Sequence, residues 1–131
     1  MFVYELIYKK ILKLVPHLFT LKIGTGLCSK AGSYMDLHLN ILQKEDNFIV
    51  IALSHTYLKN GDKVADPDME IKVYTGDNKM AEALTYQDYI CYQVVYPKPN
   101  YVNLKLKNDL NRFLNMWLSN CINQGHSFIK K

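Results

Sequence analysis

Acidic side chains near the middle of the chain are the residues best suited to chemistry. Asp66, Asp68 and Glu70 lie at every second position, and Asp62 precedes them. On a β-strand Asp68 and Glu70 share a face, and three convergent carboxylates can hold Mg²⁺ or Mn²⁺, or two of them can share a proton in acid–base catalysis. An EF-hand calcium loop is excluded, because Gly61 precedes all four acids and their spacing differs. Turns and strand entries use the same residue types, so a solvated turn is the alternative to a metal-assisted hydrolase.

Two histidines in neighbouring predicted strands are candidates for a shared metal site. Pairing the strands through their apolar residues, with Leu37 opposite Leu53, puts His38 and His55 on opposite faces of the sheet. The two histidines therefore do not share a metal ion. We expect His55 to be partly buried with a hydrogen-bond partner, and His38 to lie at the surface beside Asp36.

The segment GTGLCSK contains the glycines and lysine of a phosphate-binding loop without their spacing. Ser29 stands where the second glycine is needed, and Ala31 follows Lys30. A strand is predicted next, whereas the motif requires a helix whose N-terminus faces the phosphate. Residues 24–33 are interpreted as a loop.

The cysteines give no sign of a metal or redox site. Cys28, Cys91 and Cys121 are odd in number, far apart and outside any CxxC pair, so we expect three reduced thiols. Cys121 falls on a helical apolar stripe, as a small buried hydrophobic residue does. Because no nucleophile, base and orienting group can be assembled from the chain, the sequence predicts no catalytic residue, no metal and no cofactor.

Tyrosine is frequent, with ten residues among 131. One cluster surrounds the last predicted strand: Tyr86, Tyr89, Tyr92, Tyr96 and Tyr101. Such a cluster can form a protein interface or a stacking platform for bases, and ordinary sheet packing is the alternative. With Lys105, Lys107 and Arg112 nearby in the sequence, binding of single-stranded nucleic acid is a further possibility.

Glu82 is a single carboxylate within the apolar segment MAEAL. Alternation places it on the same face as Met80 and Leu84. A carboxylate there needs a partner, for which Lys72, Lys79 or a histidine are candidates. Glu82 is therefore a candidate for a structural ion pair and for a binding pocket.

Helical periodicity marks both ends of the chain. Residues 2–14 form an amphipathic pattern that ends at Pro16. Residues 110–122 carry an apolar stripe over more than three turns, and Gly125 stands where a helix C-cap glycine belongs.

Strand patterns fill the middle of the chain. Apolar and polar residues alternate, or apolar residues run continuously, in five segments: 35–43, 48–57, 69–74, 80–86 and 89–96. The sequence predicts a single α+β domain over residues 1–131, with a meander sheet of about five antiparallel strands and two helices packed on it. If both helices cover one side, the open side carries Asp36, His38, Glu70 and Tyr74, available to a partner or to a second copy of the chain.

Charge is unevenly distributed along the chain. The net charge is +4 overall, made up of +4 in residues 1–30, −5 in residues 31–97 and +5 in residues 98–131. If the two ends pack together, they could present a positive face to an anionic partner. We see neither an export signal nor an apolar run of the ~20 residues that cross a membrane, so we expect a cytoplasmic protein without a membrane partner.

The second half of the chain carries several ordered blocks that resemble a known family. PDMEIKVY, KMAEALTYQ, VVYPKPNYVN and LNRFLNMWLSNCINQGH resemble the YqiB-like family of small bacterial proteins, over about residues 51–126. The resemblance implies a cytoplasmic protein of bacterial or phage origin. It supplies no activity, cofactor or site residue.

Taken together, these features predict a non-enzymatic binding or adaptor domain that acts through protein–protein contacts. The tyrosine-rich last strand and the basic helices would form its surface. The metal-assisted hydrolase built on the acidic cluster and single-stranded nucleic-acid binding stay open as alternatives.

Overall fold

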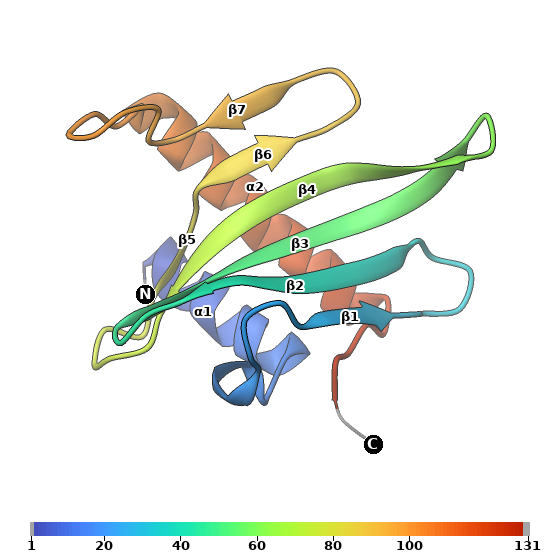
Figure 1. The fold of residues 1–131 in the computed structure, drawn as a ribbon, viewed down its shortest axis with the longest axis horizontal. Coiled ribbons are helices and arrows are strands. Elements are labelled where there is room, and N and C mark those ends of the chain that lie inside the picture. Colours follow the sequence, from blue (N-terminus) through green and yellow to red (C-terminus); the bar gives the residue numbers. More distant parts are fainter. Residues whose placement is uncertain (1, 130–131) are drawn as a thin grey trace.

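Two α-helices lie behind one antiparallel sheet in the computed structural model, which describes residues 2–129 (Figure 1). The first helix, α1 (Val3–Leu14), buries residues at three- and four-residue spacing, such as Ile7 and Ile11, and ends just before Pro16, as the sequence predicts. A short 3₁₀ helix, η1 (Leu18–Thr20), follows it. Within residues 2–129, no helix combines the length and the apolar character needed to cross a membrane.

The second helix, α2 (Leu104–Asn123), is closed at both ends by local contacts. The side chain of Asn103 accepts a hydrogen bond of 3.1 Å from the Leu106 amide, which satisfies one of the free donors of the first turn. At the other end, the His126 amide donates to the Cys121 carbonyl, and the Gly125 amide donates to the Ile122 carbonyl. Gly125 has a φ of +94°. These two bonds define a Schellman motif and confirm the predicted C-cap glycine.

The sheet contains seven strands in meander order. Their bounds are β1 (Gly26–Ser29), β2 (Asp36–Lys44), β3 (Phe48–Lys59), β4 (Asp62–Tyr74), β5 (Ala81–Ala83), β6 (Thr85–Gln87) and β7 (Tyr92–Val94). The spatial order is β1-β2-β3-β4-β6-β7, and β5 pairs with β4 beside β6. The predicted α+β class is confirmed, with two more strands than expected.

Two strand predictions were wrong in their extent. Residues 26–29 lie in β1 and pair with β2, although residues 24–33 were predicted to form a loop. The segment 80–86 was predicted as one strand, but it divides at Leu84 into β5 and β6. Both errors come from pairings between distant segments, which local composition does not record.

The long hairpin of β3 and β4 was also underestimated. Asn60 and Gly61 both have positive φ, 52° and 86°, as the central residues of a type I′ turn do. This turn allows β3 to run to Lys59 and β4 to begin at Asp62, seven residues before the predicted strand.

The predicted pairing of β2 with β3 was wrong by two residues. Leu37 lies opposite His55, and Leu39 lies opposite Leu53. The register also shifts between Ile41 and Gln43, where one extra residue bulges. Because a two-residue shift preserves the face of every side chain, the predicted faces are correct: His55 is buried beneath the helices and His38 is on the other side.

Both helices cover the same face of the sheet (Figure 1). The core between them is formed by alternate residues of the three long strands, among them Leu39, Ile51 and Ile71, together with Leu114, Trp117 and Leu118 of α2. No helix of residues 2–129 covers the opposite face of β2, β3 and β4, which we call the open face.

Candidate functional site on the open face of the sheet

Alternation along the long strands determines which side chains reach the open face. On β2 these are Asp36, His38 and Asn40, and on β4 they are Asp68, Glu70, Lys72 and Tyr74. Glu82 of β5 pairs with Lys72, so it joins the same face at the edge of the sheet. Four of the predicted site residues, Asp68, Glu70, Tyr74 and Glu82, are therefore brought onto one surface.

Glu82 is held by groups from three different parts of the chain. It is only 9% exposed. The Tyr74 hydroxyl donates to Oε2 at 2.8 Å, the Tyr96 hydroxyl donates to Oε1, and Lys107 Nζ of α2 lies 3.9 Å from Oε1. Burial, and then the hydrogen bond to Glu82, raise the pKa values of Tyr74 and Tyr96. Contact with Tyr96 raises the pKa of Lys107, and the charge of Glu82 adds to the effect.

The partners predicted for Glu82 from the sequence were Lys72, Lys79 or a histidine. Lys72 is its direct neighbour across the strand pair, but the Lys72 ammonium lies over the rings of Phe48 and Tyr74, 4.3 Å and 5.0 Å from their centroids. Lys107 takes the ion-pair role instead. Sequence reasoning missed this role because nothing local links a strand residue to a helix residue 25 positions away.

A pocket of about 400 Å³ opens beside Glu82. Its lining comes from β2, β3, β4, the segment around β5 and the residue Tyr96 after β7: Gln43, Phe48, Val50, Lys72, Tyr74, Glu82, Leu84 and Tyr96. The pocket offers a carboxylate, an ammonium group and aromatic surface, which can contact a ligand through charge, hydrogen bonds and ring faces. The arrangement is therefore suited to binding.

A second open-face pocket, of about 360 Å³, contains Asp68 and Glu70 beside Tyr92. The Thr85 hydroxyl donates to Glu70 Oε2 at 3.3 Å. Within residues 2–129, no lysine or arginine forms an ion pair with either carboxylate. Burial raises the pKa of Asp68, and the charge of Glu70 raises it further. The pair concentrates negative charge on this part of the open face, and no salt bridge within residues 2–129 offsets it.

Asp66 does not join these two carboxylates. It precedes Pro67 within the register shift between β3 and β4, and the two residues are joined by a cis peptide bond. Asp66 does not line the pocket of Asp68 and Glu70. In the described chain, Asp66, Asp68 and Glu70 do not form a three-ligand metal group.

The other predicted site residues lie apart from one another. The Lys59 ammonium lies 3.2 Å from the centroid of the exposed Tyr89 ring. Lys105 pairs with Asp109 at 2.8 Å on the exposed side of α2, where Arg112 also lies. The turn between β6 and β7 points away from the start of α2 (Figure 1). The structure therefore does not combine Tyr89 with Lys105 and Arg112 in one nucleic-acid platform.

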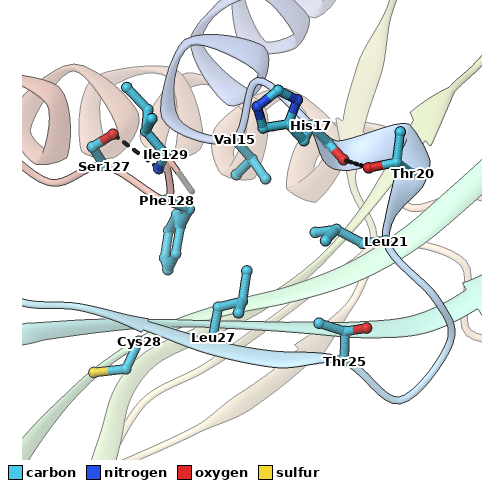
Figure 2. A pocket seen from close by; sticks show the side chains of 10 residues that line it. All are labelled: Val15, His17, Thr20, Leu21, Thr25, Leu27, Cys28, Ser127, Phe128 and Ile129. Carbon is cyan, nitrogen blue, oxygen red and sulfur yellow. Dashed lines mark hydrogen bonds between the residues drawn. The ribbon is translucent and has the colours of Figure 1, made fainter. Parts of the chain in front are cut away.

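An apolar cavity of about 590 Å³ lies between the end of α1, β1 and the C-terminal segment (Figure 2). Leu27 and Phe128 point into it, while the Cys28 sulfur points away. The Phe128 amide donates to the Leu14 carbonyl at 2.8 Å, which ties the C-terminal segment to α1. The lining of the cavity contains no Lys, Arg, Asp or Glu, so the cavity offers no such charged side chain to a ligand.

Comparison with known proteins adds a family but no activity. No curated protein and no solved structure matches the chain. Nothing in these comparisons links the chain to the YqiB-like family, and that resemblance stays a prediction. A family model described as a domain of unknown function, DUF6908, matches residues 5–127. The chain therefore belongs to the DUF6908 family.

Proposed function

We propose that this domain is a non-enzymatic protein-binding module that takes a basic segment of its partner onto the open face. One observation carries the proposal: Asp68 and Glu70 lie together in a pocket without a cationic partner from the described chain. Asp36 and Glu82, by contrast, are already paired, with Lys30 and Lys107.

A lysine or arginine of the partner would complete the pocket. Its charge would neutralise the two carboxylates, where burial and then the charge of Glu70 raise the pKa of Asp68. Tyr92 and Leu42 line the same pocket and are both exposed, so they can cover the aliphatic part of a long cationic side chain.

The charge distribution directs such a partner to one side of the molecule. Lys9, Lys13 and Arg112 lie on the helices, whereas the open face carries Asp36, Asp68, Glu70 and Glu82 together with Lys72 of β4. Complementary charge accelerates association and makes it sensitive to salt. The proposed surface differs from the tyrosine-rich strand and basic helices that the sequence favours, because the helices lie on the other side of the sheet.

The alternatives have less support from the geometry. A metal-assisted hydrolase would need the carboxylate of Asp66, which does not line the pocket of Asp68 and Glu70. Nucleic acid would be repelled by the open face and would have to bind the helices. The cytoplasm remains our proposed location, since Cys28 and Cys91 are exposed free thiols, which suit a reducing compartment.

A peptide-binding experiment tests the proposal. We would titrate the protein into a fluorescently labelled arginine-rich peptide, follow the anisotropy at low and at physiological salt, and map the contact by NMR. We expect chemical-shift changes on β2, β3 and β4, and about tenfold weaker binding for D68N/E70Q, which corresponds to about 1.4 kcal/mol.

The matched control is D46N/D77N, which removes the same charge from two exposed turns. It should bind like the unmodified protein. If both double variants bind the peptide equally weakly, the effect depends on net charge alone and the pocket is not the binding site. Absence of peptide binding at low salt would also overturn the proposal.

A further inference from the structure

Three side chains of metal-binding type meet on the open face, and one of them, Cys28, also borders the apolar cavity. Cys28 of β1 lies directly opposite His38 of β2, and Asp36 is two residues earlier on the same face of β2. One potential ligand atom from each of the three residues lies within 4.8 Å of the others. Within residues 2–129, this is the one group of three such residues.

The pairing of β1 with β2 places these three side chains beside one another on the surface of the sheet. Opposite residues on paired antiparallel strands have Cβ atoms about 5 Å apart, which suits two ligands of one ion. The Cys28 sulfur points away from the apolar cavity and is exposed (Figure 2). Asp36 and His38 are half-buried, and with the ligand atoms within 4.8 Å of one another, modest side-chain rotations would bring sulfur, nitrogen and oxygen to bonding distance from a common point.

A second contact orients His38 for the same task. Its Nε2 lies 3.0 Å from the Thr56 hydroxyl, which leaves Nδ1 as the nitrogen available to an ion. Metal-bound histidines characteristically donate their other ring N–H to an oxygen acceptor, which determines the tautomer and the ring orientation. The Thr56 hydroxyl of β3, the next strand of the sheet, can accept such a bond.

We propose that Cys28, Asp36 and His38 bind a zinc ion or a similar divalent transition metal. A thiolate, an imidazole and a carboxylate form a typical zinc ligand set, whereas Mg²⁺ and Ca²⁺ prefer oxygen ligands alone. Binding releases the thiol proton of Cys28 to solvent, and the two negative ligands balance the charge of the ion. Three protein ligands leave the fourth tetrahedral position open to water or to a side chain of a partner.

Lys30 is the group that opposes this site. Its ammonium lies 3.4 Å from Asp36 Oδ2, but the Lys30 side chain is 78% exposed, so it can move into solvent when the metal binds. This site is separate from the proposed peptide-binding pocket, and neither proposal depends on the other.

Cobalt titration tests the site directly. The full chain would be stripped with a chelator, and Co²⁺ would be added while absorption is recorded. We expect a thiolate-to-cobalt charge-transfer band in the near ultraviolet, saturation at one ion per chain, and loss of the band on addition of Zn²⁺ but not of Mg²⁺.

Variants assign the band to its ligands. Cys28→Ser should abolish it, and His38→Gln should weaken cobalt binding at least tenfold, while Cys91→Ser removes the other exposed thiol and should leave the band unchanged. Circular dichroism of each variant verifies folding. The proposal is overturned if excess Co²⁺ gives no charge-transfer band, or if the band survives in Cys28→Ser and disappears in Cys91→Ser.

Discussion

Tyr74 and Glu82 are joined by a hydrogen bond of 2.8 Å between the phenol hydroxyl and Oε2, at the place where β4 ends and β5 pairs with it. The bond links the two ends of an irregular connection, residues 75–80, and Tyr96 and Lys107 complete the shell of the same carboxylate. One buried carboxylate therefore connects the edge of the sheet, the segment after β7 and the helix layer.

Glu82→Ala should destabilise the fold by about 3 kcal/mol. The substitution leaves Lys107 without its ion-pair partner and removes the acceptor of two tyrosine hydroxyls. Tyr74→Phe removes one hydrogen bond and should cost about 1 kcal/mol. Urea unfolding measures both free energies, and a Glu82→Ala loss no larger than that of Tyr74→Phe would show that the carboxylate does not organise this region.

Leu118→Ala should reduce the free energy of unfolding by about 2–5 kcal/mol. Leu118 is fully buried in α2, where it packs in the core between helix and sheet. Met116 lies on the same helix and is 53% exposed, so Met116→Ala should change stability by less than about 0.5 kcal/mol. Similar losses for the two variants would contradict the orientation of α2.

Gly125→Ala should destabilise the protein by about 1 kcal/mol. The cost is conformational, because Gly125 has a φ of +94° and no atom lies within 4 Å of the added Cβ. Gly76 is equally open and does not have a positive φ, so Gly76→Ala is the control and should be near neutral. Thermal unfolding compares the two, and Gly125→Asn should lose less than Gly125→Ala because asparagine tolerates this conformation.

Local patterns were sufficient for the two helices and for the faces of the long strands. The spacing of apolar residues in α1 and α2 identified both helices, and the Gly125 signal identified the end of the second. Alternation in β4 placed Asp68 and Glu70 on one face without knowledge of the sheet. These features depend on periods of about 3.6 and 2 residues, which the sequence records directly.

Contacts between distant segments could not be predicted in the same way. Lys107 reaches Glu82 only because α2 crosses behind β5, and Cys28 meets His38 only because residues 26–29 form a strand. The glycine-rich composition of residues 24–33 favoured a loop, so the pairing of Cys28 with His38 was not predicted. That Asp68 forms no salt bridge within residues 2–129 also depends on where the fold places each lysine, and no single segment determines that.

Asp68→Asn should stabilise the folded protein at neutral pH while it weakens binding of a basic peptide. Burial and the charge of Glu70 raise the pKa of Asp68 above its ordinary value of 3.8. The folded protein therefore holds this proton more tightly than the unfolded chain does. The contribution of Asp68 to stability is present below pH 3.8 and is lost as the pH rises through the folded pKa.

The variant should thus gain stability at pH 7, by less than about 1 kcal/mol because solvent screens the pair, and the gain should disappear as the pH falls toward 3.8. Asp46→Asn, in an exposed turn, should show no comparable pH-dependent gain. Denaturant unfolding at several pH values measures the difference. If Asp68→Asn instead lowers stability at pH 7, then Asp68 has a favourable partner in the folded protein, and the uncompensated charge that motivates the binding proposal does not exist. If Asp68→Asn gains stability and loses peptide binding, then the folded protein keeps an energetically unfavourable pair of carboxylates, Asp68 and Glu70, because the partner binds to it.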